Sequence, residues 1–226
     1  MYKETRIPWL RLGTESAAIV GSILLAFAID AWWDSRIDDK NERQLLGALI
    51  SEFEETLLEL RNRHVTVISR EQAADTLRKL DEQSIRQLAS EELITLFLQA
   101  SSQNRADPPT GVLNSAISSG KISLIQNQEL ATLLAGWEGR LMDMRNTEED
   151  IATHLSLVFW PSISSKAVVP ERGMPVENSF REAMLDTTII NYLSLIRNLS
   201  GVNAIENERL QAEAQQILDL LNHAIE

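Results

Sequence analysis

An apolar segment near the start of the chain is the strongest hydrophobic feature of the sequence. From Ser16 to Trp33 the side chains are apolar or small, and Asp30 is the only ionisable residue among them. As a helix this segment would be about 27 Å long, close to the ~30 Å hydrocarbon thickness of a bilayer. Trp32 and Trp33 stand at its end, as aromatic residues do at membrane interfaces. The pattern predicts a transmembrane helix over residues 14–35.

Two other interpretations of this segment stay open. Lys3, Arg6 and Arg11 precede the apolar residues, and the Ala-Phe-Ala sequence at 26–28 resembles a signal-peptide cleavage site. The helical pattern nevertheless runs on through Trp33 into charged residues, which favours an anchor that is not cleaved. The length of the segment is also compatible with a buried helix of a soluble protein.

Beyond this segment, core positions recur at alternating spacings of four and three residues, which is typical of long amphipathic helices. We expect the first helix to run from the membrane to about Ser69. A second should run from about Asn127 to Trp160, before Pro161. The third stretch of this spacing ends the chain. The positions are Leu46, Ile50, Phe53, Leu57, Leu60, His64 and Val67; Leu130, Leu134, Trp137, Leu141, Met144, Glu148, Ile151, Leu155 and Val158; and Ile189, Leu193, Ile196, Ser200, Asn203, Asn207, Leu210, Ala214, Ile217, Leu221 and Ala224.

Shorter helices are predicted between the long ones, at 71–80, at 91–100 with Ser90 as N-cap, and at 110–119. Gly120 should end the last of these as a left-handed stop. The sequence thus predicts an all-α fold, in which an N-terminal transmembrane helix continues into a long helix and an up-down helical bundle follows. The expected divisions are a tail (1–13), the transmembrane helix (14–35) and the bundle domain (36–226).

Polar residues occupy several positions in the helical seams. Ser200, Asn203 and Asn207 keep the register of the last stretch, and such a layer can fix helix register or line a cavity. His64 lies on the first seam, where it is either a core histidine with a hydrogen-bond partner or part of a pH-sensitive layer.

Composition narrows the classes of function. The formal net charge is −12, which argues against nucleic acid as a partner because phosphate backbones need clustered Lys and Arg. The chain has no Cys, which excludes zinc ribbons, disulfides and thiol catalysis.

Two stretches of the chain resemble known proteins. These are "ESAAIVGSILLAFAIDAWWD" (15–34) and "SGKISLIQNQELATLLAGW" (119–137). Together they resemble an uncharacterised bacterial family of single-span membrane proteins, a domain of unknown function. The matching residues of the second stretch are Ser119, Gly120, Lys121, Leu124, Ile125, Asn127, Leu130, Leu134 and Trp137. Where that family often has Asn at the end of the span, this chain has Asp30 and Ala31. The resemblance implies a membrane protein with a helical domain and implies no activity.

Candidate chemistry is sparse. Asp150 and His154 share a helical face, residues 146–150 (NTEED) are acidic, and residues 162–166 (SISSK) place Ser near Lys. None has the spacing of a metal site or a catalytic motif, and surface roles are favoured for all of them. We therefore predict no catalytic residue, no metal and no cofactor.

The predicted site residues are structural or membrane-facing. In the span, Ala18, Ser22 and Ala26 are spaced by four with Gly21 beside them, and small residues allow close helix packing in lipid. We expect a homo-oligomer formed along this stripe. The heptad seam outside the membrane could extend that contact unless the bundle itself buries it. Asp30, Trp32 and Trp33 should lie at the membrane interface, while Gly120, Asn127 and Trp137 should be structural.

These observations predict a membrane-anchored, non-enzymatic helical scaffold that self-associates. The alternatives are a subunit of an oligomeric channel or transport accessory, with Asp30 near the pore mouth, and an extracytoplasmic sensor. We expect a single-pass protein of the bacterial inner membrane, in contact with the lipid bilayer. The basic tail would stay in the cytoplasm and the bundle would face the periplasm.

Overall fold

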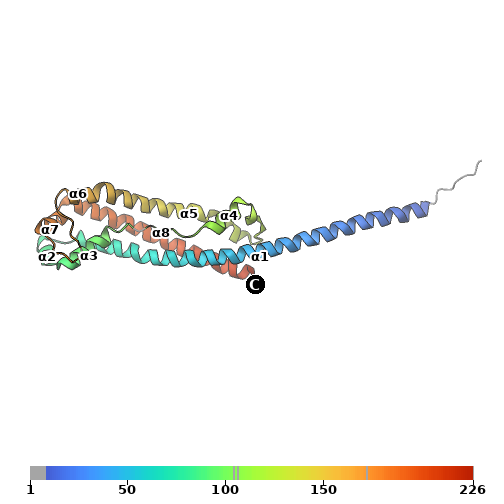
Figure 1. The fold of residues 1–226 in the computed structure, drawn as a ribbon, viewed down its shortest axis with the longest axis horizontal. Helices are drawn as coiled ribbons and strands as arrows, with labels where there is room; N and C mark the ends of the chain where they lie inside the picture. The colour runs from blue at the N-terminus through green and yellow to red at the C-terminus, as the bar shows by residue number, and fades with distance from the viewer. Residues whose placement is uncertain (1–8, 104, 106, 172, 226) are drawn as a thin grey trace, which may run out of the picture.

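A helical bundle and one long projecting helix make up the protein (Figure 1). The computed structural model describes residues 9–103, 105, 107–171 and 173–225, and side chains from Val20 onward. The described residues form helices and connecting segments with no strand among them, which confirms the predicted all-α class. The elements are α1 (Trp9–Leu77), α2 (Glu82–Gln87), α3 (Ser90–Ala100), α4 (Gly111–Ser118), the 3₁₀ helix η1 (Lys121–Leu124), α5 (Gln128–His154), the π-helical turn η2 (Leu155–Phe159), α6 (Trp160–Ser164), α7 (Asn178–Met184) and α8 (Thr187–Ile225).

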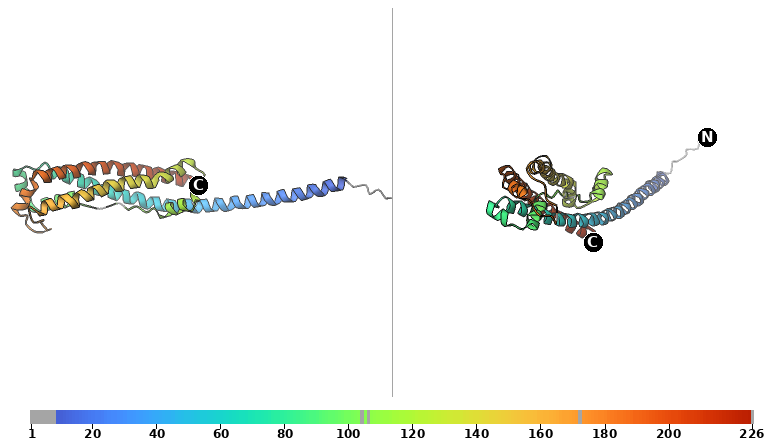
Figure 2. Two further views of the ribbon diagram at one scale, coloured as in Figure 1. Left: turned by 90° about the horizontal axis from the view of Figure 1, so that it is seen from above. Right: turned by 60° about the vertical axis from the view of Figure 1, so that its left-hand side comes forward.

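The bundle has four legs that alternate in direction, and the second leg is helical only in its first part. α1 runs away from the projecting end, α3 and the segment after it return, α5 runs away again, and α8 returns (Figures 1 and 2). In the described part of the returning segment, hydrogen bonds to α1 join Arg70 with Ser102 O, Glu59 with Asp107 N, and Thr56 with Pro109 O. An extended segment thus takes the place of a helix in the second leg, because consecutive prolines at 108 and 109 cannot continue one.

Two hydrophobic clusters fill the bundle. The basal core lies nearest the projecting end and joins α1, α4, α5 and α8. The distal core lies at the opposite end of the bundle, its tip. The basal core is formed by Leu46, Leu49, Phe53, Leu57, Leu60, Leu113, Ile125, Leu130, Leu134, Trp137, Leu141, Met144, Leu210, Ala214, Ile217, Leu218 and Leu221. The distal core is formed by Ala73, Ala74, Leu77, Ile85, Leu93, Ile94, Phe97, Ala100, Ile151, Leu155, Phe159, Ile163, Val176, Phe180, Ala183, Met184, Ile189, Leu193 and Ile196.

The heptad seam of α1 is buried inside its own chain. Leu46, Phe53, Leu57, Leu60 and Val67 are all buried, and α8 packs along this face. The seam is therefore occupied by the bundle and does not supply a surface for self-association.

α1 is longer than the sequence analysis predicts. It continues unbroken to Leu77, so the predicted end at about Ser69 and the separate helix at 71–80 are wrong. Residues 69–72 contain neither Gly nor Pro, and the buried Arg70 ties this part of the helix to α8. The additional short helix α2 begins after Asp81, whose carboxylate accepts a hydrogen bond from Ser84 N.

The helical rod of α5 also passes its predicted end. It continues through η2 and α6 to Ser164, beyond Pro161. A proline inside an α-helix removes one hydrogen bond and clashes with the carbonyl four residues earlier. The wider π turn just before Pro161, closed by Trp160 N and Leu155 O, provides the room that an α-helix lacks.

Candidate functional site

The part of α1 that leaves the bundle is the first candidate site. From Val20 to Asn41 every side chain is exposed, and we call these residues the α1 arm. The parts of the chain that the structure describes do not cover its large apolar side chains: Leu24 and Leu25 are each 63% exposed and Phe27 is 66% exposed. The arm is continuous with the helix that lines the basal core, so the bundle and the arm share one helical rod (Figure 2).

Aromatic and charged residues mark the end of the apolar part of the arm. The rings of Trp32 and Trp33 lie 6.1 Å apart between centroids, and both are exposed. The Arg36 guanidinium lies 5.5 Å from the centre of the Trp32 ring, in reach of a cation–π interaction. Asp30 lies about one turn before these residues and is also exposed.

The structure bears directly on the transmembrane helix predicted from the sequence. In the part of the chain that the structure describes, no helix has a stretch long and apolar enough to cross a bilayer. The transmembrane helix predicted for residues 14–35 is therefore not supported there. The tail 1–13 and the side chain of Ala18 lie outside the described side chains, whereas Gly21, Ser22 and Ala26 are exposed on the arm.

The three residues predicted to be structural lie at the base of the bundle. Gly120 follows α4 with φ of 75°, in the left-handed region that favours glycine. The Asn127 side chain accepts a hydrogen bond from Leu130 N, 3.1 Å away, and caps α5. Trp137 is 1% exposed and packs on Phe53 with 5.1 Å between ring centroids.

A buried polar layer separates the two hydrophobic cores and is the second candidate site. It contains Arg63 and Arg70 of α1, Glu148 of α5, and the predicted polar residues of α8. Arg63 Nε donates to Glu148 Oε1 over 2.7 Å, and the two side chains are 4% and 2% exposed. This buried ion pair joins α1 to α5.

Arg70 joins α1 to the two returning legs. Its Nε donates to Ser200 Oγ over 2.8 Å and its Nη1 to Ser102 O over 3.2 Å. The pKa of Arg70 is lowered to about 10, chiefly by burial and also by the nearby positive charge of Arg63, while Glu148 opposes this shift. The layer thus places two guanidinium groups and one carboxylate within electrostatic reach of one another.

The asparagines of α8 complete the layer. Asn207 is fully buried, its Nδ2 lies 3.9 Å from Met144 Sδ, and its Oδ1 accepts from Gln211 Nε2. Asn203 is also fully buried, and its amide oxygen and nitrogen have no hydrogen-bond partner. The same holds for Arg63 Nη1 and Nη2 and for Arg70 Nη2. Buried polar atoms are normally paired, so this concentration marks the layer as more than packing.

His64 and the other predicted polar candidates lie apart from these groups. His64 is half-buried at the edge of the layer, with Nε2 3.5 Å from Glu208 Oε1. Asp150 is exposed and His154 half-buried on α5. No group of three or more His, Asp or Glu side chains in the described parts of the chain is arranged to hold a metal ion.

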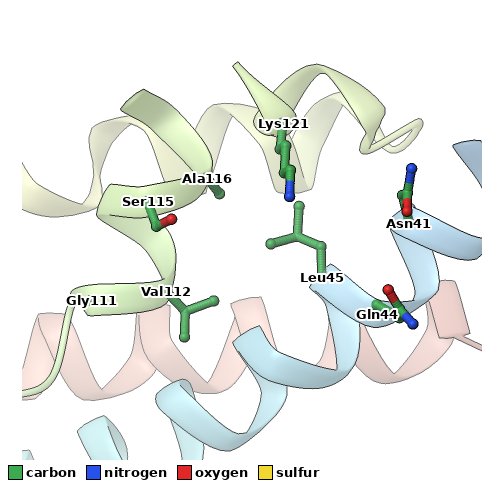
Figure 3. Close-up of a pocket in the computed structure, with 8 residues that line it drawn as sticks. All are labelled: Asn41, Gln44, Leu45, Gly111, Val112, Ser115, Ala116 and Lys121. Carbon is green, nitrogen blue, oxygen red and sulfur yellow. The ribbon is translucent and has the colours of Figure 1, made fainter. Parts of the chain in front are cut away.

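A surface pocket lies where the arm meets the bundle. It has a volume of about 400 Å³ and lies between α1, α4 and η1. Figure 3 shows Lys121 pointing into it above Leu45, with Ser115 and Asn41 on its sides. A single lysine with no acid beside it in the lining provides a polar contact but no acid–base pair.

Sequence reasoning missed the two arginines of the layer. Arg63 and Arg70 continue the spacing of three and four from Leu60 through Val67 to Ala74, so the periodicity itself places them in the core. His64 was the residue predicted for this part of the seam, because it follows Leu60 by four positions and arginine is usually a surface residue.

The chain matches no protein-family model, no curated protein and no solved structure. The resemblance to a family of single-span bacterial proteins therefore stays a prediction.

Proposed function

We propose that this protein is a membrane-anchored helical scaffold, in which the α1 arm enters a lipid bilayer and holds the bundle beside it. One observation carries the proposal: the large apolar side chains of the arm are exposed around the whole helix, and no other part of the described chain covers them. An apolar patch of this size marks a surface for lipid or for another protein.

The energy of covering the arm is large. Val20, Ile23, Leu24, Leu25, Phe27 and Ile29 are each at least half exposed. Burying such a side chain releases about 1.5–3 kcal/mol, so covering all six releases on the order of 10 kcal/mol. A free energy of this size favours permanent cover of the arm.

Lipid is the cover that best fits the ends of the segment. The apolar sequence continues back to Ser16, outside the described side chains, and Asp30 lies near its other end, where a carboxylate can reach the headgroups. Trp32 and Trp33 beside Arg36 have the chemistry of a membrane interface. From Trp33 to Leu45 the helix would then hold the bundle about 18 Å beyond the interface.

A scaffold role accounts for how arm and bundle are joined. A single helix connects them without a Gly or Pro hinge between Trp33 and Leu46, so the orientation of the bundle is coupled to that of the arm. We place the protein in the bacterial inner membrane with the bundle in the periplasm. A reporter that is active only in the cytoplasm, fused after the last residue, should be inactive, and its activity would reverse this orientation.

Self-association is the second part of the proposal. A Cβ added at Gly21 would meet no heavy atom of the chain within 4 Å, and Ser22 and Ala26 are exposed on the arm. Close approach of two arms at small residues would satisfy packing in lipid. Replacing Gly21 and Ser22 with Leu should shift the full chain toward monomer in detergent. A monomeric wild-type chain would end this part of the proposal.

Extraction and reconstitution test the anchor. The full chain should remain with membranes after alkaline carbonate washing and should float with vesicles of phosphatidylethanolamine and phosphatidylglycerol. The double variant Leu24→Arg, Leu25→Arg places two charges in the apolar part of the arm and should be released. The matched control is Leu58→Arg with Val65→Arg, two exposed positions on the bundle, and it should stay bound. A wild-type chain that is soluble and does not float would overturn the anchor.

A further inference from the structure

The polar layer between the two cores carries an excess of positive charge. Arg63 and Arg70 bring two positive charges, and Glu148 brings one negative charge. None of the three residues is more than 5% exposed. An unbalanced charge in a buried layer destabilises the folded state, because only a partner of opposite sign offsets the free energy of removing the charge from water.

Most other carboxylates near the layer are engaged at its edges. Glu206, between Asn203 and Asn207 on α8, is partly exposed and makes no ion pair with Arg63 or Arg70, and its Oε2 is buried without a hydrogen-bond partner. Glu208 pairs with His64, and Glu71 and Asp75 lie within 4 Å of Arg197. Asp75 also accepts hydrogen bonds from Arg78 and Lys79. These acids are exposed or partly exposed, and their contacts lie outside the buried layer, so they do not balance its extra charge.

The groups without partners lie close together along the bundle. The Arg70–Ser200 hydrogen bond fixes the register of the antiparallel helices α1 and α8. Asn203 therefore lies about 4.5 Å along the axis from the level of Arg70, toward the level of Arg63, which is about 10.5 Å from Arg70. At these neighbouring levels the chain has Arg63 Nη1 and Nη2, Arg70 Nη2 and the Asn203 amide, all buried and all without a hydrogen-bond partner.

We propose that this layer binds one small inorganic anion of the size of chloride, held by the guanidinium N–H groups of Arg63 and Arg70 and by the Asn203 amide N–H. The negative charge of the anion balances the excess positive charge of the layer. The anion also accepts hydrogen bonds from the guanidinium and amide N–H groups that lack a partner. We infer the small size from the burial of the side chains that form the site, because Arg63, Arg70 and Asn203 are each at most 5% exposed. The bound anion ties α1 to α8 in the middle of the bundle, independently of whether the arm binds lipid.

Thermal unfolding of the full chain in an uncharged detergent tests the site. Sodium chloride is exchanged for sodium gluconate at constant ionic strength, because gluconate is too large for the layer. A ligand that binds only the folded state raises the unfolding temperature, by about 3 °C or more for each tenfold rise in chloride above its Kd. Equal unfolding temperatures in the two salts would overturn the proposal.

Variants assign the effect to the layer. Arg70→Met removes the extra charge and one donor, and leaves the Arg63–Glu148 pair balanced, so the unfolding temperature should no longer depend on chloride. The matched control is Arg197→Met, a partly exposed arginine on α8, which should keep the dependence of the wild type. Dependence that persists in the Arg70 variant would place the anion elsewhere and overturn the assignment.

Bromide provides a readout that needs no variant. Crystals of the wild-type chain grown with sodium bromide should show an anomalous scattering peak among Arg63, Arg70 and Asn203. Water at this place, without an anomalous peak, would show that solvent satisfies the donors and would overturn the proposal even if chloride stabilised the fold. A peak without any effect of chloride on unfolding would indicate binding at crystal concentration only and would also count against it.

Discussion

At the scale of single residues, the buried polar layer shows how one carboxylate can decide the stability of a helix interface. Glu148 has 2% of its side chain exposed and accepts from Arg63 over 2.7 Å. Its neutral neighbours, Met144 and Ile151, belong to the two hydrophobic cores on either side. A charged pair at this boundary contributes little net stability, but the loss of one member leaves the other charge buried and unpaired.

Glu148→Gln should therefore destabilise the bundle strongly. The amide keeps the size of the side chain but leaves both arginines without a carboxylate, which costs about 3–5 kcal/mol. Denaturant unfolding of the full chain measures this change. Glu149→Gln, at an exposed position next in the sequence, is the control and should change stability by less than about 0.5 kcal/mol. Equal stabilities of the two variants would show that the layer is hydrated in solution.

Trp137→Ala should remove the largest side chain of the basal core. Trp137 is 1% exposed and packs against Phe53, so the truncation leaves a cavity and should cost about 3–5 kcal/mol. Met142→Ala, on the exposed side of the same helix, should be close to neutral in the same denaturant titration. A Trp137 variant that unfolds like the wild type but loses a binding partner would identify Trp137 as part of a binding site.

At the scale of helices and loops, periodicity predicted the long helices well and their ends poorly. The spacing of apolar residues located α5 and α8, because long buried faces dominate their stability. It could not show that α1 passes Ser69 or that a π turn carries α5 past Pro161, since both depend on contacts with other helices. Ser90, predicted as an N-cap, is instead the first residue of α3, and its Oγ accepts from Val176 N in the loop before α7.

The sequence also could not predict that a side chain of another helix caps α4. The N-terminus of α4 has no side-chain cap of its own, because Thr110 makes no capping hydrogen bond. Instead the buried Glu52 of α1 accepts from Val112 N over 2.6 Å and from Leu113 N over 3.0 Å. Val112 and Leu113 are about 60 positions away from Glu52 in sequence, so no local sequence motif predicts the contact.

Glu52→Gln should loosen α4 selectively. The amide accepts weaker hydrogen bonds and loses the favourable interaction of a carboxylate with a helix N-terminus, at a cost of about 1–2 kcal/mol. Hydrogen exchange should become faster in residues 111–118 than in α5 or α8. Glu55→Gln, an exposed neighbour on α1, should leave exchange in α4 unchanged. Uniformly faster exchange in all helices would show instead that α4 unfolds only with the whole bundle.

At the scale of the whole molecule, the fold divides into a bundle that buries its large apolar side chains in two cores and an arm that leaves them exposed. Both cores are built from residues between Leu46 and Leu221. The arm, by contrast, has exposed side chains from Val20 to Asn41. Sequence hydrophobicity alone identified the apolar segment, but only the three-dimensional arrangement shows that its side chains from Val20 onward are left exposed by the bundle.

Removal of residues 1–41 should therefore leave the stability of the bundle almost unchanged. The deleted side chains that the structure describes are all exposed, so the unfolding temperature should shift by no more than about 2 °C. The truncated chain should also stay soluble without detergent and fail to float with vesicles, because the apolar segment is gone. Deletion of residues 211–226 is the contrasting control: it removes Ala214, Ile217 and Leu221 from the basal core and should unfold the protein. A truncated chain 42–226 that unfolds or aggregates would show that the arm packs on the bundle in solution, and the arm would then have to be described as part of the folded domain.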